Sequence, residues 1–130
     1  MTKKELFEEA HEITRNIVKE TGVNYRVQFG ICLSFLYQIK KEVEKEVEFK
    51  GLTVGSPKQI AWAEKIREGL LEEAKKYAEL EIILSDTAEE VEEAMATYKA
   101  FVNLANTNDA RFIINNLKNR DYIFIIENLL

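Results

Sequence analysis

The chain has 130 residues, of which 46% are hydrophobic and 32% charged, a balance typical of an ordinary globular protein and not of a disordered one. No apolar run approaches the roughly 20 residues that span a bilayer, and the N-terminus leads straight into an amphipathic pattern, so we expect neither a membrane span nor a signal peptide. Because Cys32 is the only cysteine, an internal disulfide is excluded and a cytoplasmic location is expected.

The net charge of −5 is unevenly distributed. Basic and acidic residues balance within residues 1–50, whereas residues 51–130 carry the whole acidic excess. Residues 72–93 are the most acidic stretch, with Glu72, Glu73, Glu79, Glu81, Asp86, Glu89, Glu90, Glu92 and Glu93 against Lys75 and Lys76. Such a surface repels phosphate and favours a basic partner, although a solvated helix face has the same composition.

The first 50 residues predict two helices. Apolar residues recur at helical spacing from Leu6 to Ile17, and Gly22 is a natural end for this first helix. A second helix is expected to start near Asn24 or Tyr25. Its predicted inner face holds Phe29, Cys32 or Leu33, Leu36, Ile39 or Lys40, Val43 and Val47. The alternating charges of residues 40–50 indicate an exposed helical end that reaches the loop between glycines 51 and 55.

The third predicted helix opens at the only proline and carries the only tryptophan. Ser56 can cap it, Pro57 fits the first helical position, and Gln59 completes a capping box. The helix should run toward Leu84. Its apolar stripe is Ala63, Ile66, Leu70, Ala74 and Tyr77. The short run 82–84 could instead form a buried extended segment.

The rest of the sequence contains the starts of three further secondary-structure elements. Asp86 with Glu89 predicts a helix through Ala105, and residues 106–109 break that helix and cap another from Ala110 to about Lys118. Asp121 begins a terminal element over residues 122–130, where helix and strand both remain open. Since no partner strand is evident, we favour a helix. The predicted fold is an all-α bundle of five or six helices, with an N-terminal hairpin module (1–50) and a C-terminal module (51–130) as sub-bundles joined near residues 51–55.

Two segments resemble modules of small proteins encoded by phages and mobile elements of Gram-positive bacteria. Residues 10–37 (AHEITRNIVKETGVNYRVQFGICLSFLY) carry the pattern Ala-His-x-x-Thr followed by Tyr-Arg-x-x-Phe-Gly. Residues 52–67, with Gly-Ser-x-Lys-Gln-Ile-x-Trp-Ala-Glu-x-Ile-Arg, and residues 109–113, with Asp-Ala-Arg-Phe-Ile, are similar to a second module. Ile113 stands where that module has Trp, and Asn115 or Asn116 replaces its Asp.

The resemblance implies a phage or mobile-element setting inside a bacterial host cell. Small acidic helical proteins from this setting are often inhibitors of host defence, including anti-CRISPR proteins. We therefore expect an interaction protein that blocks a host defence nuclease by placing an acidic face in a basic nucleic-acid groove. The residues assigned to this face are Glu72, Glu73, Glu79, Glu89, Glu90, Glu92 and Glu93.

Catalysis has little support in the sequence, and we expect no enzyme, metal or cofactor. His11 is the only histidine, so a histidine-based metal site or triad lacks partners. On the first helix it could face Glu8 and Arg15, and we expect it to form local hydrogen bonds or to pack between helices. Cys32 falls on an apolar face and is interpreted as a buried hydrophobe. The carboxylate pair Glu89 and Glu93 should face water, and no Gly-rich phosphate loop is present.

The alternative hypothesis is a small nucleic-acid-binding accessory protein. Its candidate cations lie near the first interhelical turn and at the start of the third helix. They are Arg15, Lys19, Arg26, Lys58, Lys65 and Arg67. The acidic net charge and the lack of a concentrated basic stripe count against this reading.

Two aromatic residues are candidate interface anchors. Trp62 is interpreted first as a core residue in the helix seam and second as an exposed anchor, where tryptophan is enriched. Tyr25 is expected to be half exposed beside Arg26, while Phe29 should lie in the core. A third hypothesis is a homodimer formed through the apolar segment Ile123–Leu130.

Overall fold

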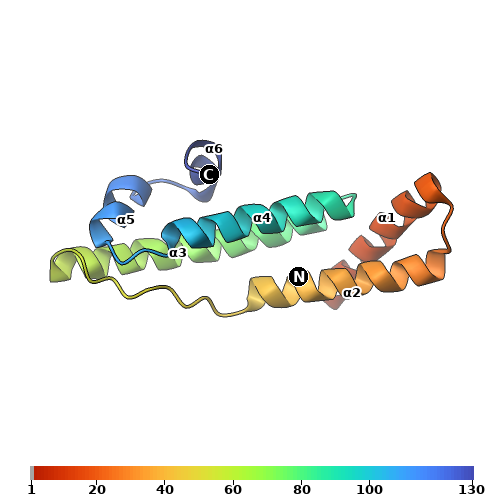
Figure 1. Cartoon of the computed structure of the whole chain (residues 1–130), viewed down its shortest axis with the longest axis horizontal. Helices are drawn as coiled ribbons and strands as arrows, with labels where there is room; N and C mark the ends of the chain where they lie inside the picture. The colour runs from red at the N-terminus through yellow and green to blue at the C-terminus, as the bar shows by residue number, and fades with distance from the viewer. Residues whose placement is uncertain (1) are drawn as a thin grey trace. The chain divides into compact units, whose positions relative to one another are not determined.

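A computed structural model describes residues Thr2–Leu130, and this range folds into six α-helices (Figure 1). The helices are α1 (Lys3–Thr21), α2 (Tyr25–Glu44), α3 (Pro57–Ile83), α4 (Ala88–Ala105), α5 (Ala110–Leu117) and α6 (Tyr122–Asn128). Extended pairing within this range is limited to one isolated bridge between Val54 and Asp109. The predicted all-α fold of five or six helices is confirmed, and the number in the described range is six.

The chain divides into two compact units, and each is described by itself. Unit 1 comprises Met1–Lys45 with Tyr77–Ala96, and unit 2 comprises Glu46–Lys76 with Thr97–Leu130. Because α3 and α4 each contribute residues to both units, the chain passes between them at three places. Each unit therefore combines residues from both modules that the sequence suggested.

In unit 1 the ends of the first two helices follow from local side-chain chemistry. Thr2 caps α1 and forms a capping box with Glu5, and Gly22 ends the helix in the left-handed conformation at φ 70°. Asn24 accepts the backbone N–H of Val27 and so caps α2. Both predicted boundaries are confirmed.

The core of unit 1 follows the apolar spacing of its helices. α1 packs against α2, and the C-terminal part of α3 leads into the N-terminal part of α4 through residues 84–87. The buried apolar side chains of this unit are Leu6, Ala10, Ile13, Cys32, Leu36, Val43, Ala78, Ile82, Val91, Ala94 and Met95. Ile82 and Ile83 belong to α3, so the suggestion of an extended segment there is wrong.

The second helix ends earlier than its charge pattern predicts. α2 stops at Glu44, and residues 46–53 are not helical, so Val47 does not lie on a helical face. The reason is tertiary, because the Lys50 N–H donates to Asn106 Oδ1 at 2.8 Å and Thr53 and Val54 donate to the Asn108 carbonyl. These bonds need an extended backbone, and i to i+4 charge pairs contribute only about 0.2–0.5 kcal/mol each.

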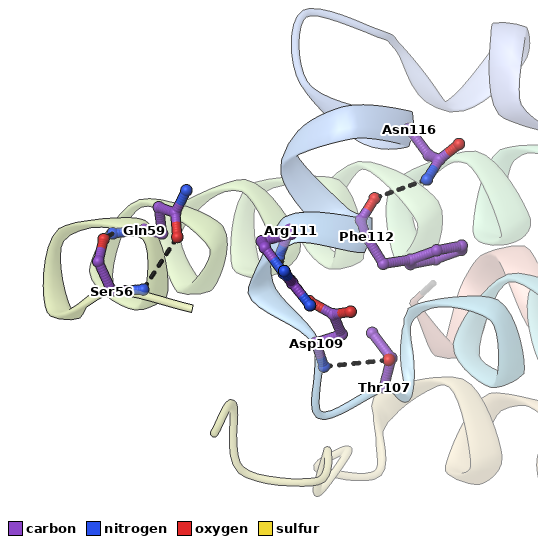
Figure 2. A network of polar contacts seen from close by, with 7 residues as sticks. All are labelled: Ser56, Gln59, Thr107, Asp109, Arg111, Phe112 and Asn116. Atoms are coloured by element: carbon purple, nitrogen blue, oxygen red, sulfur yellow. Dashed lines mark hydrogen bonds and ion pairs between the residues drawn. The ribbon is translucent and has the colours of Figure 1, made fainter. Parts of the chain in front are cut away.

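In unit 2, α3 begins with the capping box expected from the sequence. The Gln59 N–H donates to Ser56 Oγ, and the Ser56 N–H donates to Gln59 Oε1, as Figure 2 shows. Gly55 precedes this cap at φ 128°, and a Cβ there would lie 3.3 Å from that of Ala110. Glycine is favoured here because this backbone conformation strains any side chain, and a Cβ would in addition force Ala110 or Gln59 to shift.

The remaining core of unit 2 is built around the two C-terminal helices. Asp109 caps α5 by accepting the Arg111 N–H at 2.9 Å, in the network of Figure 2. The buried apolar side chains of unit 2 are Leu52, Ala63, Leu70, Ala74, Tyr98, Phe101, Ala105, Ala110, Ile113, Leu117, Tyr122 and Ile125. The rings of Phe101 and Tyr122 meet edge to face at 5.3 Å.

The terminal element left open between helix and strand is a helix. Asp121 caps α6 by accepting the Phe124 N–H, and the Glu73 carboxylate accepts the Tyr122 N–H at 3.0 Å. The local cap outweighs the β propensity of the run 123–126 because no neighbouring strand offers hydrogen bonds.

Candidate partner-binding surface

The first turn of α4 is organised by a threonine cap. The Glu90 N–H donates to Thr87 Oγ1 at 3.2 Å, and the Asp86 N–H donates to Glu90 Oε2 at 2.9 Å. The cap is therefore Thr87, one residue after the predicted Asp86, and its partner is Glu90 instead of Glu89. Carboxylates in this turn also gain from the positive end of the helix dipole.

Three carboxylates gather on one exposed face of α4 within unit 1. Glu89, Glu92 and Glu93 are exposed and, with Ala96, line a shallow hollow of about 300 Å³. Their spacings of three and four residues place them on the same side of the helix, where like charges repel one another. A cation in this hollow would relieve that repulsion. We call Glu89, Glu90, Glu92 and Glu93 the α4 acidic surface.

The other acidic residues of the predicted face are placed differently. Glu79 is half buried in unit 1, whereas Glu72 and Glu73 belong to unit 2. Glu73 is used within unit 2, since it holds the first backbone N–H of α6. The structure thus brings together the acids of α4 but does not join Glu72 and Glu73 to them.

The predicted cations divide between the two units. Arg15, Lys19 and Arg26 are exposed in unit 1, and Lys58 and Lys65 are exposed in unit 2. Arg15 donates a hydrogen bond to the Glu12 carboxylate at 2.6 Å, and this bond raises the pKa of Arg15. A nucleic-acid site is expected to concentrate its cations in one basic stripe, whereas these five exposed cations are divided between the two units, three in unit 1 and two in unit 2.

Arg67 is not part of an exposed cation cluster, and that prediction is wrong. Its side chain is buried, with the residue 7% exposed. The guanidinium donates to the carbonyls of Ala105, Thr107 and Lys50 at 3.1–3.3 Å and lies 4.5 Å from the Phe49 ring centroid. Burial lowers its pKa, while Glu64 and Glu68 act in the opposite direction. Arg67 therefore joins α3 to the end of α4, to Thr107 just after it, and to the non-helical segment that holds Lys50.

Trp62 lies at the surface of unit 2, so its interpretation as a core residue is wrong. It is 44% exposed, and the Lys118 ammonium stands 4.5 Å from its ring centroid. The buried side of α3 is taken by Ala63 and Arg67, which are four residues apart. Trp62 precedes that row by one residue and is turned about 100° away from it. The alternative of an exposed anchor remains a prediction.

Tyr25 belongs to an aromatic cluster between α1 and α2. His11 Nδ1 is hydrogen-bonded to the Tyr25 hydroxyl, and the His11 ring stacks on Phe29 with centroids 4.1 Å apart. The histidine therefore has the helix-packing role that was one of its two expected roles, and its partners lie on α2. Tyr25 is half exposed, as predicted, but Phe29 is also only half buried.

Glu9 is a notable buried residue that the sequence analysis overlooked. It is 4% exposed, and its Oε1 atom has no hydrogen-bond partner among residues 2–130. Burial raises its pKa from 4.5 to about 8, with further contributions from Asp86, Glu12 and Glu90. A sequence signal existed, because Glu9 falls three residues after Leu6 and four before Ile13, inside the apolar stripe of α1.

A second hollow, of about 250 Å³, lies between α1 and the start of α4 in unit 1. Its lining residues are Ile13, Asn16, Ile17, Glu20, Thr87, Ala88 and Glu89. The Asn16 amide donates to the Asp86 carbonyl at 2.5 Å and so ties α1 to the turn before α4. The α4 acidic surface shares Glu89 with this hollow, and Glu90 of the same surface acts on the pKa of Glu9.

Reactive and metal-binding groups are sparse in the part of the chain that the structure describes. Cys32 is buried, as predicted. Between Thr2 and Leu130, no three His, Cys, Asp or Glu side chains form a group that could hold a metal ion. No helix in this range combines the length and apolarity needed to cross a membrane.

Comparisons of this chain with protein-family models, with curated proteins and with solved structures found no match.

Proposed function

We propose that this chain is a non-enzymatic interaction protein whose α4 acidic surface binds a basic surface of another protein. The observation that carries the proposal is the exposure of Glu89, Glu92 and Glu93 around one hollow on a single helix face. Lysine or arginine side chains of a partner would meet several carboxylates at once, which favours both attraction and orientation.

The resemblance to phage and mobile-element modules supplies the partner class. In that setting the basic surface belongs to a host defence nuclease, and its nucleic-acid groove presents the required lysines and arginines. The α4 acidic surface would then compete with nucleic acid for the groove. This mode of inhibition needs no catalytic group in the chain.

The proposal is tested by charge reversal. The chain is used as bait in a lysate of a Gram-positive bacterium, captured proteins are identified by mass spectrometry, and the Kd of the purified partner is measured. Glu89→Lys with Glu92→Lys should weaken binding about tenfold or more, because attraction at both positions becomes repulsion. Glu46→Lys with Glu48→Lys is the matched control, since these exposed residues of unit 2 change the net charge equally.

Two outcomes would contradict the proposal. Equal weakening by both charge reversals would show that only the net charge matters, and unchanged binding between low and high salt would exclude an electrostatic interface. Duplex DNA provides a further test at low salt. The proposal predicts no electrophoretic shift, whereas a shift that is lost when Lys58 and Lys65 are changed to Gln would favour the nucleic-acid alternative.

A further inference from the structure

One carboxyl group of unit 1 is buried where a charge is unfavourable. Glu9 lies on the inner face of α1 between the buried residues Leu6 and Ile13, and it is itself 4% exposed. Its Oε1 atom has no hydrogen-bond partner within the described residues. An ionised carboxylate in this position would lose hydration at Oε1 without gaining a compensating donor there.

The charged groups that act on Glu9 are all negative. Glu12 comes from α1 itself, Asp86 from the turn between α3 and α4, and Glu90 from the first turn of α4. On the side of α2, His11 of α1 contacts the Tyr25 and Phe29 side chains. A proton on Glu9 removes the repulsion from three carboxylates at once. Since no group of three ligands here could hold a metal, a proton is the cation that the geometry accommodates.

We propose that the contact between α1 and the start of α4 is a pH-dependent latch, closed while Glu9 is protonated and loosened when Glu9 ionises. Two features of this contact allow α1 and α4 to separate. A hydrogen bond from the Asn16 amide to the Asp86 carbonyl bridges it, and the 250 Å³ hollow flanks it. Separation at this point would admit water to the Glu9 carboxylate without disturbing the packing of α1 on α2.

The direction of the pH dependence follows from proton linkage. The pKa of Glu9 is 4.5 as a free side chain and about 8 in the folded chain. Between these values the folded chain holds a proton that the unfolded chain has lost, so rising pH favours opening and unfolding. The stabilisation is complete below pH 4.5, decreases as the pH rises, and is lost above pH 8. The latch is therefore closed at neutral pH and opens in mild alkali.

The latch goes beyond the proposed function and does not depend on it. The same turn of α4 carries both Glu90, which acts on Glu9, and Glu89, which belongs to the α4 acidic surface. Opening would therefore change the position of that surface in a pH-dependent manner. The experiment below uses the chain alone, so its failure is distinguishable from a failure to find a basic partner.

The test is amide hydrogen exchange of the full chain at pH 6.5 and pH 9, corrected for intrinsic exchange. In the wild type, protection of residues 9–16 and 86–92 should fall about tenfold at pH 9, while the core of unit 2 stays protected. Glu9→Gln mimics the protonated side chain and should abolish this fall. Glu8→Gln is the matched control, because Glu8 is exposed on the same helix and its variant should behave as the wild type.

A direct titration of the wild type keeps the proposal testable if Glu9→Gln fails to fold. The carboxyl carbon of Glu9, followed by NMR, should titrate near pH 8. Titration near pH 4.5, or equal protection of both segments at the two pH values, would overturn the proposal.

Discussion

Arg67 shows how a charged side chain can act as a core residue. It occupies an inner position of α3, where an apolar side chain is usual. Its planar guanidinium donates to three backbone carbonyls from two separate segments. The Ala105 carbonyl ends α4, whereas those of Lys50 and Thr107 lie in non-helical stretches. A guanidinium suits this task because it presents several donors in a fixed plane and stacks on the Phe49 ring.

At the residue scale we predict that Arg67→Lys destabilises unit 2. An ammonium group cannot reach all three carbonyls or stack on Phe49, so the free energy of unfolding should fall by about 1–3 kcal/mol. Urea denaturation followed by circular dichroism measures the loss. Lys65→Arg is the control, since Lys65 is exposed on the same helix. A change below about 0.5 kcal/mol in Arg67→Lys would show that the buried hydrogen bonds contribute little.

The helices of this chain are delimited by short side-chain caps. Polar residues accept a backbone N–H at the start of α1, α2, α3, α4, α5 and α6. At the start of α3 the cap is reciprocal and is preceded by a glycine that no other residue can replace without strain. Each cap is a contact within two or three residues, which is why sequence inspection finds most of them.

At the element scale we predict that Ser56→Ala destabilises the start of α3. Loss of the hydroxyl leaves the Gln59 N–H without its acceptor, which should reduce the free energy of unfolding by about 1 kcal/mol. The measurement is chemical denaturation, with hydrogen exchange of residues 57–60 as a local readout. Ser34→Ala in the middle of α2 serves as control, because that position caps no helix. If both variants lose the same stability, the cap is not the cause.

At the scale of the whole molecule, the packing of α6 affects the hypothesis of self-association. Tyr122 and Ile125 are buried in unit 2, whereas Ile123 and Phe124 are exposed. The terminal segment thus has an inner side that completes a core and an outer side that is available to a second copy. Removal of the whole segment would affect both the core and any association with a second copy, so it would not distinguish these two roles.

We predict that a chain ending at Asn119 is destabilised, irrespective of its oligomeric state. It loses the buried Tyr122 and Ile125 side chains and uncovers Phe101, which should cost at least about 3 kcal/mol. Denaturation of both chains measures this loss. Ile123→Ser, which changes only an exposed side chain, should leave stability nearly unchanged, and its sedimentation reports on association. Wild-type stability in the shortened chain would contradict the observed packing.

Local sequence signals were sufficient for most of the fold. The all-α class, the six helices, the glycine end of α1 and the capping box of α3 follow from spacing and from contacts within a few residues. The end of α2 was mispredicted because residues 50–54 pair with residues 106–110, which are more than 50 positions away. A local charge pattern carries no information about such a partner.

The features of the candidate site likewise divide into those that the sequence predicts and those that depend on the tertiary structure. The sequence alone identified the acidic run and expected its α4 members to face water, since helical periodicity separates them from Val91 and Met95. Only the tertiary structure decided that Arg67 is buried, that Trp62 is exposed, and that Glu9 faces three other carboxylates. The physical reason is range: caps and helical faces depend on neighbours along the chain, whereas burial and a shifted pKa depend on segments that only folding brings together.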